Sequence, residues 1–327
     1  TDAEMVVAVS PAGKSLRIAG TTGLVLGGSI DAVVNDKYRK AIREALQGYD
    51  TGKVFEERIE ARLNQALSGG IKRVAPMGST AGFNSDREAE QMRYQKLGAD
   101  GVDLLLDLTM TYGVYGYEGT MVAKLEGKLR SIPKGSRQWD ETVVASPGPI
   151  LASARLGDPT NRLSPAMSGA RLSVEDEAVG RWTSDGGALL RQDFEAAVDG
   201  AISALLCDLG LAEEALGEYN LGKRELNAKH FAEAASHFRK AIALDNALAH
   251  AHNGLAVTLA HADKLDEAIA MTIALTERSP DYAPAWYNLA WWHATEKKDP
   301  NAAKPYYERA RALGMAQDEK IEKALKK

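Results

Sequence analysis

The residues of this chain that could bind a nucleotide lie near its beginning, in the stretch AVSPAGKS at residues 8–15. Ala8, Gly13, Lys14 and Ser15 fit a relaxed phosphate-loop pattern in which alanine replaces the first glycine. In such a loop, backbone N–H groups and the lysine hold the phosphates, and the serine hydroxyl reaches magnesium at the start of a helix. The glycine-rich continuation, LRIAGTTGLVLGG, instead favours a surface turn between two strands. A nucleotide-binding enzyme is therefore an alternative that the remaining sequence has to support.

Other reactive side chains do not occur at catalytic or metal-binding spacings. Cys207 is the only cysteine, so no intramolecular disulfide can form, and its surroundings, ISALLCDLG, predict a buried helix residue. No nucleophile elbow, activated cysteine or dinucleotide fingerprint is present. No histidine has partner cysteines at a zinc-site spacing. The histidines are His230, His237, His250, His252, His261 and His293. We therefore expect a protein that is not an enzyme and needs no cofactor or metal.

Length and composition describe an ordinary globular chain. Its 327 residues and 35.2 kDa correspond to about two domains. A formal net charge of −5 and a pI near 5.8 give no support for nucleic-acid binding. The longest apolar runs are too short for a transmembrane segment.

A repeat with a period of 34 residues occupies the C-terminal third. Leu221, Leu255 and Leu289 recur at this distance within the similar phrases EYNLGKREL, HNGLAVTL and WYNLAWWH. Each leucine is followed, further along the same repeat, by a small residue at a similar distance: Ala234, Ala268 and Ala303. The distance from Leu289 to Ala303 is one residue longer than the corresponding distance in the first two repeats, which an insertion in the turn near residues 298–300 would explain. Such a period predicts stacked helical hairpins, because one hairpin cannot bury its apolar face alone.

These phrases resemble the tetratricopeptide repeat (TPR) over about residues 215–315. The resemblance implies an all-α TPR solenoid, within 211–315, that binds other polypeptides. The three repeats are expected at about 215–248, 249–282 and 283–316, followed by a capping helix at 316–327.

The resemblance also implies that the first helix of each hairpin lines a concave peptide-binding groove. The groove positions fall on Tyr219, Asn220, Lys223, Asn227, Asn253, Val257, His261, Tyr287, Asn288, Trp291 and Thr295. Asn220 and Asn288 match an asparagine that the family uses to hold a peptide's backbone or carboxylate, whereas Gly254 replaces it in the second repeat. Trp291 is expected to be accessible, and Trp286 and Trp292 to lie in the core.

The first 180 residues predict an α/β sandwich domain of α+β type. Strands are expected at 5–9 and near 71–77, and helices at about 29–46, 54–67 and 85–98. Alternating residues in DLLLDLTMTYGV and TMVAKLEGKLRSI then predict a hairpin with one packed and one wet face, and RQWDETVVAS a further strand of an antiparallel meander. We expect a long irregular loop at 147–180 and, at 181–210, a connecting amphipathic helix that covers the first repeat.

The order of these elements, with the phrase GADGVDLLLDLTMTYGVYGY, resembles envelope lipoprotein domains related to the curli-secretion channel and the penicillin-binding-protein activators over about residues 5–205. That resemblance implies a periplasmic or outer-membrane-associated protein whose sandwich contacts other proteins. It would place a lipid anchor upstream of Thr1. A cytoplasmic protein is the alternative.

The sequence as a whole predicts a non-enzymatic scaffold that binds a peptide or partner helix in its TPR groove. Besides the nucleotide-binding enzyme, one further alternative is open. A structural subunit whose groove is filled by a neighbouring copy would form a homo-oligomeric ring or filament.

Overall fold

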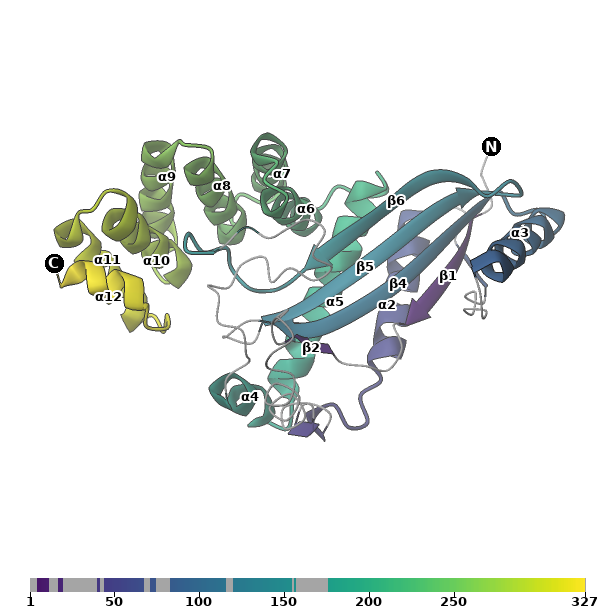
Figure 1. Cartoon of the computed structure of the whole chain (residues 1–327), viewed down its shortest axis with the longest axis horizontal. Helices are drawn as coiled ribbons and strands as arrows, with labels where there is room; N and C mark the ends of the chain where they lie inside the picture. The colour runs from purple at the N-terminus through teal and green to yellow at the C-terminus, as the bar shows by residue number, and fades with distance from the viewer. Residues whose placement is uncertain are drawn as a thin grey trace.

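The chain folds into an α/β part followed by a series of helices, giving the α+β architecture expected (Figure 1). This computed structural model describes residues 5–11, 17–19, 40–41, 44–67, 71–74, 83–115, 120–154, 156 and 176–326. The phosphate-loop residues 12–16, most of the helix expected at 29–46, and most of the loop expected at 147–180 lie outside these ranges.

The described strands form one mixed sheet in the order β3-β1-β4-β5-β6. They are β1 (Met5–Pro11), β2 (Arg17–Ala19), β3 (Lys72–Val74), β4 (Leu104–Tyr115), β5 (Thr120–Ser131) and β6 (Ser136–Ala145). β4, β5 and β6 form the expected antiparallel meander, while β1 pairs in parallel with both β3 and β4. β2 pairs in parallel with β4 beyond the end of β1. A strand therefore follows residues 12–16, where a phosphate loop would lead into a helix.

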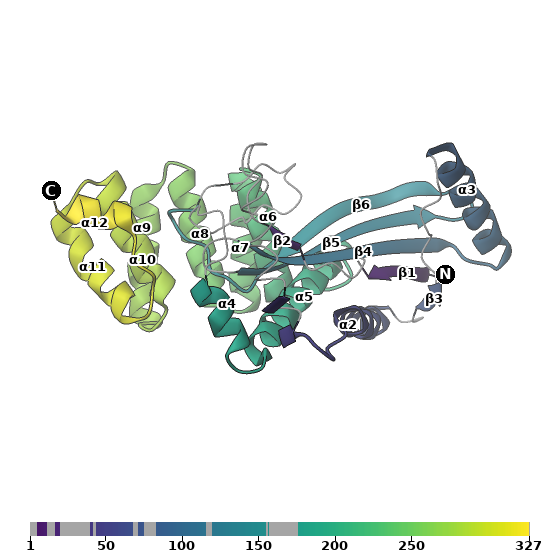
Figure 2. The ribbon, with the colours of Figure 1, turned by 60° about the horizontal axis from the view of Figure 1, so that its bottom comes forward.

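Helices α2 (Thr51–Ala66) and α5 (Ala188–Asp208) cover the larger apolar face of the sheet, and α4 (Asp176–Thr183) packs on α5 (Figure 2). The side chain of Asp50 caps α2 by accepting from the N–H of Lys53 at 3.0 Å. Phe55, Ile59 and Leu63 recur every four residues on one side of this helix and are fully buried. The second half of α5, residues 200–206, is buried on all sides because it lies between the sheet and the first helix of the repeats.

The other face of the β4–β5 hairpin is partly covered, whereas the sequence predicts that it is exposed to solvent. Helix α3 (Phe83–Ala99) packs there, at the end of the sheet far from the repeats, with Tyr94 and Leu97 against Leu105 (Figure 2). Val122 and Lys124, expected to be solvated, are 3% and 7% exposed. Alternation along a strand separates its two faces, but it does not say whether the second face is covered.

Paired antiparallel helices follow α5 (Figure 1). They are α6 (Ala215–Asn227) with α7 (Phe231–Leu244), α8 (Ala249–His261) with α9 (Leu265–Arg278), and α10 (Ala283–Trp291) with α11 (Pro300–Ala312). Helix α12 (Glu319–Leu325) packs on α11, with Ile321 fully buried. The first helices of the pairs begin at 215, 249 and 283, so they keep the predicted 34-residue period.

The extra residue of the third repeat lies in a π-helical turn, η1 (Trp292–Glu296), and not in the inter-helix turn as predicted. Lys297 N–H donates to the carbonyl of Trp292, five residues back, at 2.9 Å. The turns themselves keep one form, with a left-handed residue at Lys229, Asp263 and Lys298. A π-turn holds one more residue than an α-turn, so the helix absorbs the insertion before the loop begins.

The first two helix pairs meet around one aromatic ring. Phe238 of α7 is fully buried against Gly222 of α6 and Gly254 of α8. A Cβ added at Gly254 would lie 2.6 Å from Cε1 of Phe238. The second repeat therefore has glycine at this position because a larger residue would collide with the ring of the preceding helix.

We predict that Gly254→Ala destabilises the protein by about 1–3 kcal/mol, because Phe238 has to leave its site. Urea unfolding followed by circular dichroism measures the change. Gly180→Ala is the matched control, because Gly180 lies in helix α4 and no atom lies within 4 Å of the added Cβ. The control should be neutral or stabilising, since alanine favours a helix more than glycine does. Equal effects of the two substitutions would contradict this account of the packing.

Candidate functional site: a groove occupied by the chain itself

The side of the helix pairs formed by α6, α8 and α10, where the sequence predicts the peptide groove, holds a segment of the same chain. This groove segment, residues 146–153, leaves the end of β6 and runs towards α8 and α10 (Figure 1). It contacts the first helix of each pair, namely α6, α8 and α10. Ile150 and Leu151 are 0% and 5% exposed and belong to the apolar core of the repeats.

Two buried asparagines hold the backbone of the groove segment. Asn253 of α8 donates from Nδ2 to the carbonyl oxygen of Ile150 at 2.7 Å. Asn288 of α10 accepts the N–H of Ala152 on Oδ1 at 2.7 Å and donates from Nδ2 to the oxygens of Ile150 and Asn253 at 3.3 and 2.8 Å. The amide groups thus satisfy one backbone acceptor and one backbone donor without using a side chain of the segment.

The asparagine pair differs from the pair that the repeat pattern predicts. Asn220 contacts the carbonyl oxygens of Gly200 and Leu216, at the contact between α5 and α6, and not the groove segment. Gly254 makes room for Phe238, as described above. Asn253, one position earlier, reaches the segment in its place. A shift of one residue turns a helical side chain by about 100°, so the two positions face different neighbours.

Lys223 of α6 holds the first residues of the groove segment. Its Nζ donates to the hydroxyl and carbonyl oxygens of Ser146 at 2.8 and 3.0 Å and to the carbonyl of Gly148 at 3.4 Å. It also lies 5.2 Å from the centre of the Tyr219 ring. The side chain is 4% exposed, and burial lowers the pKa of Lys223 to about 7.

The aromatic residues of the third repeat are also covered. The hydroxyl of Tyr287 donates to the Asp318 carboxylate at 2.7 Å and lies within hydrogen-bond distance of Ser153 Oγ, at 2.8 Å. Trp291 is 9% exposed, stacks on Tyr287 and lies under Lys320 of α12, so the expectation that it is accessible is wrong. Trp286, expected in the core, is only partly buried and donates to the carbonyl of Pro280.

The remaining predicted groove residues do not contact the groove segment through a side-chain hydrogen bond that the described atoms show. Val257 is buried in the repeat core, and Tyr219 packs on Phe238 and His250. The ring of His261 stacks on Phe231, and Thr295 donates to the carbonyl of Trp291. Asn227, at the end of α6, is partly exposed.

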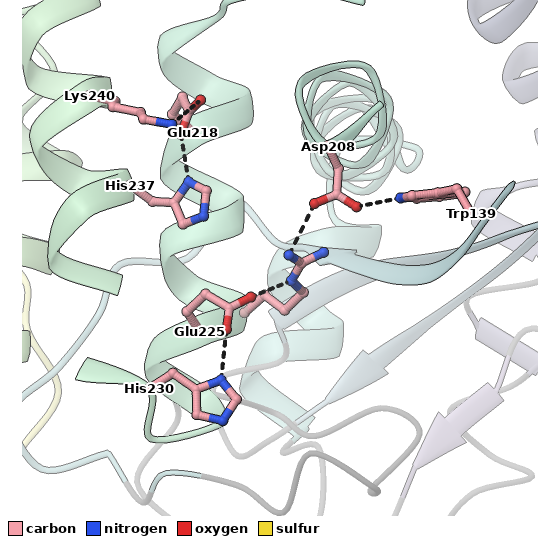
Figure 3. Close-up of polar contacts among 8 residues, drawn as sticks. Trp139, Asp208, Glu218, Glu225, His230, His237 and Lys240 are labelled. Carbon is pink, nitrogen blue, oxygen red and sulfur yellow. Dashed lines mark hydrogen bonds and ion pairs between the residues drawn. The ribbon is translucent and has the colours of Figure 1, made fainter. Parts of the chain in front are cut away.

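Charged residues join the first repeat to the α/β part (Figure 3). Asp208 of α5 accepts from the indole of Trp139 at 2.9 Å and from Arg224 of α6 at 3.0 Å. Arg224 also donates to the carboxylate of Glu225, which in turn contacts His230 at 2.9 Å. Burial would raise the pKa of Glu225, but the hydrogen bonds from His230 and Arg224 outweigh it and lower that pKa. The network fixes β6 against α6, and so it fixes where the groove segment starts.

A second polar cluster links α6 with α7, where Glu218 contacts His237 at 2.6 Å and Lys240 at 3.8 Å (Figure 3). Among the described residues, no group of histidine, cysteine and carboxylate side chains is arranged to hold a metal ion. Cys207 packs against Gly217 at the contact between α5 and α6, and burial raises the pKa of its thiol. In the described structure, the Glu218 cluster and Cys207 therefore contribute to the packing of neighbouring helices.

Stacked helix pairs of this kind define a helical repeat module. Comparison with protein families agrees, because the family model of the tetratricopeptide repeat matches residues 225–290. The match includes Asn253 and nearly all of α10 with Asn288. No curated protein sequence matches the chain. The expected resemblance of residues 5–205 to envelope lipoproteins receives no support and stays a prediction.

In the described structure, no helix has the length and apolar character needed to span a membrane.

The groove segment was not predicted, although its sequence contains a signal. Pro147 and Pro149 follow β6 directly, and proline has no N–H to continue a strand ladder. The pair Ile150-Leu151 is apolar within a stretch expected to be an irregular loop. Together these features indicate a segment that leaves the sheet and buries two side chains elsewhere.

We predict that Asn253→Ala and Asn288→Ala each lower the free energy of unfolding by about 1–3 kcal/mol, because each leaves a buried backbone group without its partner. The double variant should lose less than the sum, since the two amides bond to each other and share the Ile150 carbonyl. Urea unfolding measures all three, with exposed Asn301→Ala as the neutral control. Strictly additive losses would contradict a shared network.

We predict that Lys223 makes stability depend on pH. Its folded pKa of about 7 lies below the unfolded value of 10.5, so the unfolded chain holds this proton more strongly. Raising the pH from 7 to 10 therefore favours the folded state, and below pH 7 the contribution is constant. Relative to Lys223→Met, the wild type should gain at least about 1 kcal/mol across this window. Thermal unfolding of both proteins at pH 6, 7, 8.5 and 10 measures it, and a constant difference would contradict the prediction.

Proposed function

We propose that this protein is a non-enzymatic scaffold whose TPR groove binds a peptide or partner helix. The observation that carries the proposal is the pair Asn253–Asn288, which holds one backbone carbonyl and one backbone N–H of residues 150–152. An amide pair of this kind accepts any chain that presents a backbone carbonyl and, two residues later, a backbone N–H, as Ile150 and Ala152 do here. The family match supports the same class of function, because tetratricopeptide repeats are typically protein-binding modules.

The rigid attachment of the first repeat to the sheet supports a scaffold over a pair of freely jointed domains. α5 packs on β5, β6 and α6, and Asp208 at its end binds Trp139 and Arg224 on either side. A partner held in the groove would therefore have a fixed position relative to the α/β part. That part would carry the second interaction of the scaffold, and its expected setting in the bacterial cell envelope belongs to the same proposal.

An array of immobilised ten-residue peptides, probed with the full chain, tests the proposed function. We expect a subset of the peptides to be retained by the wild type and by Asn301→Ala, and to be lost with the double variant Asn253→Ala/Asn288→Ala. Circular dichroism of the double variant establishes that it is folded under the conditions of the array. If a folded double variant retains the same peptides, the groove is not the binding site and the proposal is wrong.

A further inference from the structure

Because the groove is filled in the structure, any partner has to replace what fills it. We infer that residues 146–153 are a resident ligand, which competes for the groove with a partner peptide carrying two adjacent aliphatic residues. This inference rests on the proposed function and adds its regulation and the chemistry of the partner.

The chemistry of the partner follows from how the groove segment is held. Asn253 and Asn288 contact only its main chain, so they set direction and position without selecting a sequence. Selection comes from the two buried side chains, Ile150 and Leu151, which join the apolar core of the repeats. A competing peptide therefore needs two neighbouring aliphatic residues with small residues after them, as Ala152 and Ser153 are here.

The segment is suited to leave the groove without disturbing the sheet. β6 ends at Ala145, whose partner on β5 is Ala123, and Pro147 and Pro149 prevent the ladder from continuing. Its backbone is paired instead with side chains of α6, α8 and α10, and in a local turn the N–H of Ala154 donates to the carbonyl of Leu151 at 3.0 Å. Departure of the segment would expose Ile150 and Leu151 and remove the backbone partners of both asparagines, which would keep only the bond between their two amides, so a ligand that supplies the same groups is needed to stabilise the open groove.

Competition within one chain is strong because the segment is tethered next to its site. Tethering on a short connection gives an effective concentration in the millimolar range. If the groove is filled 99% of the time, an added peptide binds about 100-fold more weakly than to an open groove. The wild type should consequently bind short peptides weakly, and release of the segment should strengthen that binding without any change in the groove itself.

The probe for this test is the fluorescent peptide ASPGPILASA, which copies residues 145–154. Anisotropy titration compares the wild type with Ile150→Ser/Leu151→Ser, in which the resident segment loses its two apolar anchors but the groove is unchanged. We expect at least about tenfold tighter binding to this loosened variant. The peptide ASPGPSSASA should bind neither protein, and Asn253→Ala/Asn288→Ala added to the loosened variant should abolish binding.

Hydrogen exchange of the unmodified chain gives a second measurement that needs no variant to fold. Excess ASPGPILASA should accelerate exchange of the backbone amides at 150–154 and leave those of α8 and α10 protected. The inference is overturned if these amides exchange only with global unfolding, whether or not peptide is present.

The outcomes separate the inference from the function on which it rests. Equal affinity for the wild type and the loosened variant would overturn the competition while leaving a peptide-binding groove. Failure of the folded loosened variant to bind ASPGPILASA would overturn the proposed function as well. A loosened variant that forms a dimer in sedimentation would show that the occupant is a second copy of this chain, and would overturn the inference of a foreign peptide.

Discussion

The buried backbone of residues 150–152 is the constraint on which the arrangement of the two parts depends. Buried N–H and C=O groups need partners, and a segment that contains Pro147 and Pro149 cannot find them in a sheet. Asn253 and Asn288 supply these partners from two successive repeats. These bonds join the repeats to the α/β part at a second point, away from their covalent connection through α5. They also mean that the segment that fills the groove belongs to the same chain.

This second attachment works together with the first. Trp139, Asp208 and Arg224 connect β6, α5 and α6, and the chain that leaves β6 is the one that enters the groove. Lys223 lies between the two attachments and contacts Ser146 and Gly148, the first residues after the strand. Sheet, connecting helix and repeats consequently share one continuous set of contacts, in which a change at the groove alters the environment of the sheet edge.

Much of the fold could be predicted because its signals are local. The 34-residue period located the first helices of all repeats, and alternation located the meander of β4, β5 and β6. The groove segment could not be found in this way, since Ile150 and Asn253 are 103 residues apart and neither period nor propensity connects them. Spacing revealed that the third repeat contains an extra residue, but it could not tell a π-turn from a longer loop. Asn253 contacts residue 150 of the groove segment, but its pairing with Asn288 depends on how the two helices are rotated, which the repeat pattern does not give.

Leu221, whose recurrence first marked the repeats, belongs to the core of the α/β part. The concave side draws residues 146–153 from before the repeats, and α5 closes the outer side of α6. A fragment that begins at α6 would lack both residues 146–153 and α5, and the apolar side chains that they cover would be exposed to solvent. The repeats are therefore not an independent domain, and fusing them alone to another protein would preserve neither their stability nor their selectivity.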